Sequence, residues 1–289
     1  MAAPSLPEEV RRHCAQVAAH TRHVRIDPAA TSATAGVAGL DADDHFLEGD
    51  AEDVARYVLI LDAVNFGSGW FGELRDGTTI GMTRRLTADA RARGAPWTPA
   101  ELRALTPTVV ATVLEEEAAH PLMGHYAAGL RDLGALLGDG GALDLVARAG
   151  GSAARFARLL ADALPQLADR GFYKRAQITA NDLVLAGVAA FDDVDELTVF
   201  ADNLLPHVLR LDGVLVYDDE LAAQIDGGTP LVAGGRMESE LRACAVHACE
   251  ALAARAGVPP RTLDNWLWHR GLQPPYADRP AHVTHTTFY

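Results

Sequence analysis

Two residues of one short segment, Phe200 and Asp202, could together bind a flat heterocycle. A phenyl ring stacks on a heteroaromatic base, and a carboxylate can accept hydrogen bonds from the N–H edge of that base. If Leu197–Asp202 is helical, its apolar residues face the core and Asp202 lies off that face, in solvent. Pro206 disfavours helix just before it, so the alternative is a helix that ends early and leaves both side chains in one pocket.

A second polar set, Lys174, Gln177 and Asn181, follows a helical period and shares one helix face. One interpretation is an ordinary surface helix that carries a cation and two amides. The alternative is a clamp for phosphate or ribose, or a positive charge held near a catalytic carboxylate.

A third set lies near the end of the chain, where Asp264 and Asn265 precede Trp266, Trp268 and His269. Two tryptophans and an imidazole in one short helix could form the wall of a binding pocket. The alternative is a helix that is simply anchored by its tryptophans.

Three residue pairs have metal-ligand types at helical spacing: His20-x-x-His23, Glu117-x-x-His120 and His247-x-x-Glu250. A carboxylate-bridged di-metal site needs two Glu-x-x-His elements and two further glutamates, and this sequence supplies one such element. We predict surface or structural roles for these pairs, and we expect neither a metal site nor a cofactor. The glycine motifs of serine hydrolases, dinucleotide-binding folds and P-loops do not occur in the required context.

The elements that must position these residues are mostly helices, because alanine is abundant and aromatic residues make up only 6% of the chain. Thr-Pro pairs at Thr98 and Thr106 are typical helix starts. We expect one helical domain over 1–289, or two helical lobes of about 1–125 and 126–289, with one or two small strand pairs. The expected helices cover about 7–23, 51–65, two or three segments within 126–170, 174–191, 237–254 and 261–271. The best strand candidate is 214–217. The aromatic tail 280–289 is expected to pack onto the body.

Composition limits the class of protein and of partner. The 289 residues include 49% apolar residues and carry a formal charge of −14, without a long basic cluster. A long nucleic acid or an anionic membrane is therefore an unfavourable partner, whereas one local basic group could still hold a single nucleotide. The three cysteines form no CxxC motif, and the first residues do not resemble a signal peptide. No apolar stretch is long enough to span a bilayer. We therefore expect a cytoplasmic protein.

Taken in order, these segments resemble the queuosine salvage protein family, whose members are queuosine 5′-phosphate N-glycosylases. The resemblance runs collinearly from about residue 45 to the end of the chain. The matching segments are Leu61–Phe66 ("LDxxNF"), Lys174–Ile178 ("KRAQI"), Leu197–Asp202 ("LTxFAD"), Gly213–Tyr217 ("GVLxY"), Glu240–Ala243 ("EIRA"), Leu267-Trp268 ("LW") and the terminal Phe288-Tyr289.

The resemblance implies a mainly α fold related to the helix-hairpin-helix DNA glycosylases. It implies hydrolysis of queuosine 5′-phosphate to queuine and ribose 5-phosphate, without a cofactor. The family carries an acidic residue directly after its "LW", where this chain has His269, and it carries Tyr where this chain has Asn265. By position, the resemblance implies that the base is bound by His45, Phe200, Asp202, Asp264 and Asn265.

Loss of a purine-like base leaves positive charge on C1′, which a nearby carboxylate must stabilise. Our leading hypothesis is an N-glycosylase in which Phe200 stacks the base, Asp202 and Asp264 hold its polar edge, and Lys174 lies near the ribose or phosphate. Trp268 would line the pocket, and His269 would act as an acid or position water. Two alternatives follow from His269: a diverged biosynthetic paralogue that acts on another heteroaromatic substrate, and a catalytically silent base-binding protein. The sequence does not indicate the oligomeric state.

Overall fold

The computed structural model describes residues 4–32 and 39–289, and helices carry most of them. Local capping residues set many helix starts. The Ser5 side chain accepts from the Glu8 N–H while the Glu8 carboxylate accepts from the Ser5 N–H, and Thr98 and Glu101 form the same capping box. The helices are α1 (Leu6–Ala18), α2 (Ala51–Val64), α3 (Thr79–Arg93), α4 (Pro99–Arg103), α5 (Pro107–Leu114), α6 (Pro121–Leu137), α7 (Gly141–Ala147), α8 (Ala153–Ala163), α9 (Lys174–Leu185), α10 (Leu204–Leu211), α11 (Asp219–Asp226), α12 (Arg236–Ala256) and α13 (Pro260–Gly271), with 3₁₀ turns η1 (Ser68–Glu73), η2 (Pro165–Leu167) and η3 (Val194–Glu196).

The only sheet within the described residues is a pair of short strands. Strand β1 (Val24–Ile26) lies antiparallel to β2 (Leu215–Tyr217), with Val24 opposite Tyr217. The expectation of a mainly helical fold with a small strand pair is therefore confirmed, while the relation to helix-hairpin-helix glycosylases stays a prediction.

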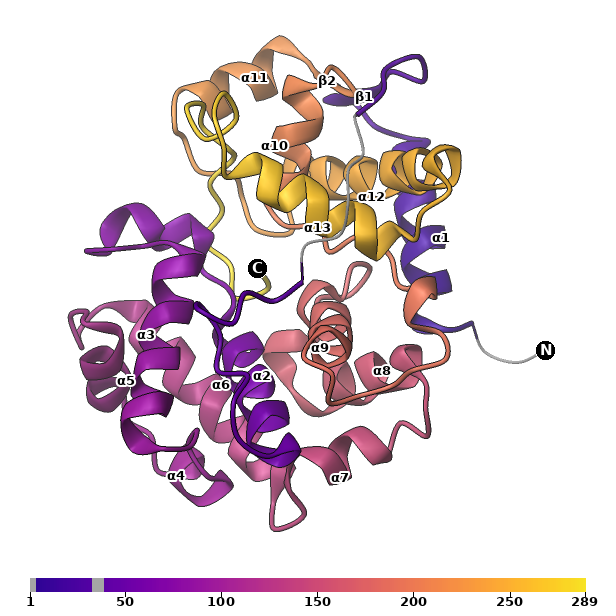
Figure 1. Ribbon diagram of the computed structural model, residues 1–289. Coiled ribbons are helices and arrows are strands. Elements are labelled where there is room, and N and C mark those ends of the chain that lie inside the picture. The colour runs from indigo at the N-terminus through magenta and orange to yellow at the C-terminus, as the bar shows by residue number, and fades with distance from the viewer. Residues whose placement is uncertain (1–3, 33–38) are drawn as a thin grey trace.

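Figure 1 shows the helices in two groups, with α2 to α9 in the lower group and α1, α10 to α13 and both strands in the upper one. The first helix packs along α12, so the start of the chain lies beside its last third. The C-terminus lies between the groups. The suggested lobe boundary at 125/126 falls inside α6, and whether the chain forms one domain or two lobes stays a prediction.

The C-terminal tail packs onto the body, as its aromatic residues predict. The Gly67 N–H donates to the Tyr289 carbonyl at 2.9 Å, and the Leu231 N–H donates to the Val283 carbonyl at 2.8 Å. Both His282 and Tyr289 are buried. No helix within 4–32 and 39–289 combines the length and apolarity needed to cross a membrane.

Candidate active site

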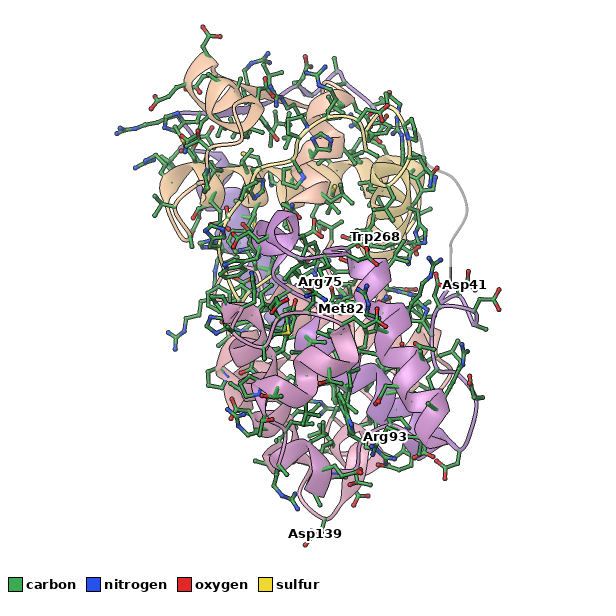
Figure 2. All side chains as sticks on the ribbon, turned by 90° about the vertical axis from the view of Figure 1, so that its left-hand side faces the viewer. Asp41, Arg75, Met82, Arg93, Asp139 and Trp268 are labelled. Atoms are coloured by element: carbon green, nitrogen blue, oxygen red, sulfur yellow. The ribbon has the colours of Figure 1, made fainter. Side chains whose placement is uncertain are left out.

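A cavity of about 670 Å³ lies between the two groups of helices. Its walls come from α2, η1, α3, α9 and α13, from the segment before α10, and from the C-terminal residue Tyr289. In Figure 2, Trp268 of α13 lies where the two groups meet. All eight predicted site residues line this one cavity: His45, Lys174, Phe200, Asp202, Asp264, Asn265, Trp268 and His269.

The polar set on α9 is buried, so the surface-helix interpretation is wrong. Lys174 is 5% exposed, and its ammonium makes no hydrogen bond or ion pair with any described residue. Burial lowers the pKa of Lys174, and the nearby carboxylates of Asp202 and Asp62 oppose that shift. A buried ammonium on the cavity wall is a ready partner for an anionic or hydroxylated ligand.

Gln177 lies on the same helix but does not line the cavity. Its amide oxygen accepts from the Thr198 N–H at 3.0 Å, and its amide nitrogen donates to the Phe172 carbonyl at 2.9 Å. This residue therefore positions the segment that carries Phe200.

The segment Leu197–Asp202 is not helical, which corrects the expectation of a core-facing helix stripe there. Instead, the Phe200 N–H donates to Asp264 Oδ1 at 2.7 Å. Asp202 Oδ1 accepts from the N–H groups of Leu204 and Leu205, at 2.8 and 3.2 Å, at the start of α10. These bonds hold Phe200 and Asp202 in one extended turn on the cavity wall. The alternative of a helix that ends before Pro206 is also wrong, because Leu205 and Pro206 lie in the first turn of α10, although both side chains do line one pocket.

Asp264 lies on α13 with its carboxyl group buried. Burial raises the pKa of Asp264 to about 8, the Phe200 N–H opposes that shift, and the charge of Asp202 adds to it. Asp264 therefore carries a proton at neutral pH, so one carboxyl group in the cavity can donate a hydrogen bond while Asp202 accepts. Next to it, Asn265 Oδ1 is buried without a hydrogen-bond partner among the described residues, so it is an acceptor that a ligand could use.

Two imidazoles, His45 and His269, also line the cavity. Nδ1 of His45 bonds to the Asp41 carbonyl and Nδ1 of His269 to the Asn265 carbonyl, both at 2.8 Å. Since a carbonyl only accepts, Nδ1 is protonated in each ring and Nε2 is the atom left for a ligand. The Trp268 ring meets the His269 ring edge-on, with centroids 5.1 Å apart.

Sequence reasoning missed several carboxyl groups at the cavity, of which Asp182 and Asp62 are the two on α9 and α2. Asp182 lines the cavity beside Asn181, and Asp62 lies behind the cavity wall in the apolar helix α2, 1% exposed, with both oxygens unpartnered among the described residues. The helical period could have found Asp182, because it lies eight residues after Lys174 and thus on the same face. A lone carboxylate within the apolar run of α2 was the signal for Asp62.

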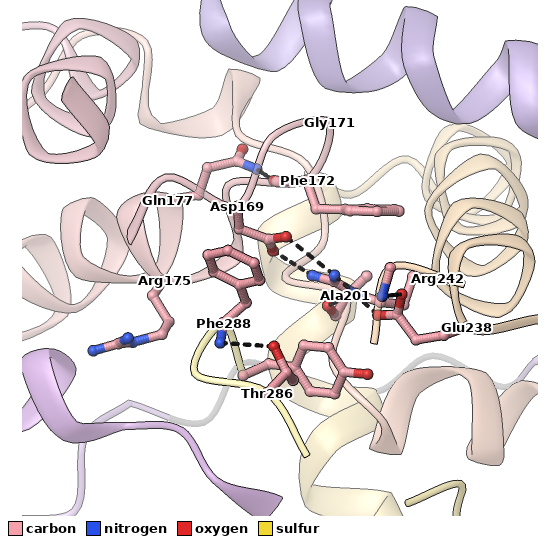
Figure 3. A network of polar contacts seen from close by, with 12 residues as sticks. Asp169, Gly171, Phe172, Arg175, Gln177, Ala201, Glu238, Arg242, Thr286 and Phe288 are labelled. Atoms are coloured by element: carbon pink, nitrogen blue, oxygen red, sulfur yellow. Dashed lines mark hydrogen bonds and ion pairs between the residues drawn. The ribbon is translucent and has the colours of Figure 1, made fainter. Parts of the chain in front are cut away.

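Buried arginines fix the parts of the chain that meet at the cavity, and Figure 3 shows one of them, Arg242, with Asp169 and Glu238. Arg242 pairs with Asp169 and Glu238, and its guanidinium lies over the rings of Phe172 and Tyr289, 4.0 and 4.4 Å from their centroids. These contacts hold the C-terminal residue where it lines the cavity.

Arg175 performs a similar task in the lower group of helices. It donates to the carbonyls of Asp62 and Ala63 at the end of α2, and to the Thr287 carbonyl in the tail. The tail is thus tied to α2 as well as to α12.

The predicted metal-type pairs are engaged elsewhere. His20 bonds to the Gln16 carbonyl, Glu117 pairs with Arg75, and Glu250 pairs with Arg11. Among the described residues, a grouping of three metal-type ligands occurs at the surface, outside the cavity lining. It consists of His23, Asp218 and Glu220.

The comparisons with known proteins agree with the motif order. Residues 45–289 match the model of the queuosine salvage protein family. A queuosine 5′-phosphate N-glycosylase/hydrolase of Sphaerobacter thermophilus is 35% identical over 272 residues, which is 85% of this chain and 84% of that protein. A protein of the same name from Dictyostelium discoideum is 36% identical over 41% of this chain and 40% of its own length. Another from Mus musculus is 34% identical over 40% of this chain and 38% of its own length. The chain belongs to the queuosine salvage protein family.

Proposed function

We propose that this protein hydrolyses the N-glycosidic bond of queuosine 5′-phosphate and releases queuine and ribose 5-phosphate. Family membership supports the reaction class, since relatives carry the name queuosine 5′-phosphate N-glycosylase/hydrolase. The observation that carries the proposal is the meeting of Phe200, Asp202 and Asp264 in one cavity with the buried Lys174.

Each of these residues has a task in the proposed complex. Phe200 stacks on the 7-deazapurine, and Asp202 accepts hydrogen bonds from its N–H edge. Asp264 carries a proton at neutral pH, so it can donate to the base and protonate it as the bond to C1′ breaks. Lys174 lies near the ribose or phosphate, and His45, Asn265, Trp268 and His269 complete the wall.

The cavity and the charge of the molecule favour a single nucleotide over a polymer. A volume of about 670 Å³ lies within the range of small-molecule sites, and the formal charge of −14 opposes binding of a long nucleic acid. The proposed reaction uses water and needs no cofactor. We place it in the cytoplasm, since the three cysteines are free and buried.

The test is release of queuine, detected by mass spectrometry, from queuosine 5′-phosphate and from dephosphorylated queuosine. We expect release by the wild type, and a loss of about 10- to 100-fold for Asp202→Ala, because a hydrogen bond to a charged group is worth about 1.5–3 kcal/mol. Asp226→Asn, an exposed carboxylate outside the cavity lining, is the matched control and should release queuine at the wild-type rate. Absence of release by the wild type from both substrates would contradict the proposal.

His269 favours one second candidate, a base-binding protein without catalysis. An imidazole does not supply the fixed negative charge that a cation at C1′ requires. This candidate predicts tight binding of queuine in calorimetry together with no turnover of queuosine 5′-phosphate. Turnover by the wild type would exclude it.

A further inference from the structure

The carboxylate of Asp182 lies on the cavity face of α9. Lys174, Ile178, Asn181 and Asp182 fall at helical spacing, and all four line the cavity. Asp182 is thus presented to the same space as Lys174, two helical turns further along the helix. The charge of Asp182 also raises the pKa of Asp264, so the two carboxyl groups lie within electrostatic reach of each other.

A chain of hydrogen bonds fixes the orientation of Asp182. Arg261 donates to Asn181 Oδ1 at 3.2 Å, and Asn181 Nδ2 donates to Asp182 Oδ1 at 3.0 Å. Because a guanidinium only donates, the Asn181 amide oxygen must face Arg261, and its NH₂ group must face Asp182. Asp195, which accepts from Arg261 at 2.7 Å, completes the chain. A functional carboxylate that must keep one orientation is expected to have such a fixed hydrogen-bond partner, which for Asp182 is Asn181.

The surroundings leave Asp182 able to ionise. Burial raises the pKa of Asp182 to about 6, while the Asn181 hydrogen bond and the Lys174 charge oppose the shift. The neighbouring Asp62 is buried, and burial together with the Asp182 charge raises its pKa well above the usual range. Of these two carboxyl groups, Asp182 therefore ionises more readily than Asp62.

Of the other acidic residues in the cavity lining, Asp41 accepts from the Asp43 N–H, Asp44 pairs with Arg84, and Asp202 and Asp264 have different tasks. Asp202 Oδ1 accepts two backbone N–H groups of α10, and Asp264 is protonated and bound to the Phe200 N–H. No hydrogen bond to the side-chain carboxylate of Asp182 other than that from Asn181 occurs within the part of the chain that the structure describes. The second carboxylate oxygen of Asp182 is therefore free to meet a ligand or a water molecule.

We propose that Asp182 is the catalytic general base of this protein, the carboxylate that activates water at C1′. The inference rests on the proposed function. In the step, the C1′–N bond breaks, its electron pair goes to the base, and the base takes the proton of Asp264. Water adds to C1′ and gives a proton to Asp182. The sum is nucleotide plus water to free base plus ribose 5-phosphate, and proton exchange with solvent then restores both carboxyl groups.

The experiment compares the wild type with Asp182→Asn in single-turnover release of queuine from queuosine 5′-phosphate. General base catalysis contributes about 10²–10⁴-fold, so we expect the rate to fall by that factor. Queuine should bind both proteins with the same affinity in calorimetry, within about twofold, because Asp182 is assigned to the sugar side. Asp192→Asn, an exposed aspartate outside the cavity lining, is the matched control and should keep the wild-type rate.

A second variant, Asp182→Ala, separates a chemical role from a structural one. Added formate can occupy the vacated space and accept the proton from water, so we expect it to raise the rate of this variant at least about tenfold. A merely structural role would give no such rescue.

Each outcome decides between the hypotheses. If the wild type releases queuine and Asp182→Asn releases it at a rate within tenfold of the wild-type rate, the role of Asp182 is overturned. The proposed function then stays intact. A variant that binds queuine, is inactive and is rescued by formate supports the role. Asp182→Ala that binds queuine and stays inactive in formate overturns it. If the wild type releases no queuine, the proposed function itself fails, and the inference fails with it.

Discussion

The proton on Asp264 should be visible in the stability of the protein. Replacement by asparagine keeps the size of the side chain and an oxygen that can accept from the Phe200 N–H. It removes the titration of a carboxyl group whose pKa burial raises to about 8 in the folded protein. In the unfolded chain the same group titrates near about 3.9.

The sign and size of the effect follow from proton linkage. Between these two pKa values the folded protein holds one more proton than the unfolded chain. The stabilisation linked to that proton is fully present below about pH 4 and is lost as the pH rises toward about 8, at about 1.4 kcal/mol per pH unit. From pH 5.5 to 7.5 the wild type should therefore lose about 3 kcal/mol relative to Asp264→Asn.

The assay is urea denaturation at pH 5.5, 6.5 and 7.5 and constant ionic strength, followed by far-UV circular dichroism. The difference in unfolding free energy between the two proteins is the quantity compared. Contributions from Asp62, Asp182 and Lys174 largely cancel in it, because Asp264 is neutral over this range and asparagine is neutral too. A difference that stays constant from pH 5.5 to 7.5 would refute the protonated state of Asp264.

Asp226→Asn is the matched control. Arg210 donates to the Asp226 carboxylate and lowers its pKa. The stabilisation linked to Asp226 is thus present above the unfolded pKa and is lost only as the pH falls below about 4. Its difference from the wild type should not change between pH 5.5 and 7.5.

Two further predictions concern the tail and the stacking residue. A Cβ at Gly69 would overlap the Thr284 carbonyl, so Gly69→Ala should lower the free energy of unfolding by about 1–3 kcal/mol in denaturation experiments. A Cβ at Gly72 meets nothing within 4 Å, so the control Gly72→Ala should leave the free energy of unfolding nearly unchanged. Equal stability of the two variants would disprove the close approach of the tail. Phe200→Ala should weaken queuine binding in calorimetry by about 5- to 150-fold, since stacking on an aromatic ring is worth about 1–3 kcal/mol per base. An unchanged affinity would remove Phe200 from the base site.

Much of the secondary structure follows from local signals in the sequence. Helix α2 begins after the capping residue Asp50, and α4 begins at the Thr98-Pro99 pair with a capping box. The strand expected at 214–217 is β2, which covers Leu215–Tyr217. Caps and apolar periods act over a few residues, so they can be read without the rest of the fold.

Some local predictions fail where a distant residue competes for the backbone. The apolar spacing of Leu197–Asp202 favours a helix, yet Gln177 accepts the Thr198 N–H and Asp264 accepts the Phe200 N–H. These side chains satisfy donors that a helix would have used, and so they hold the segment extended. The helix expected over 7–23 likewise ends at Ala18, and the chain then enters β1, which needs β2 as its partner.

The candidate site shows the same division. Residue types and motif order in the sequence determined the family and named eight residues that line one cavity. Only the tertiary structure decided that Lys174 is buried among carboxylates, that Asp264 keeps a proton, and that Asp182 belongs to the site. The reason is physical: chemical type is a property of each residue, whereas burial and charge proximity depend on segments that are distant in the sequence and meet only in the folded chain.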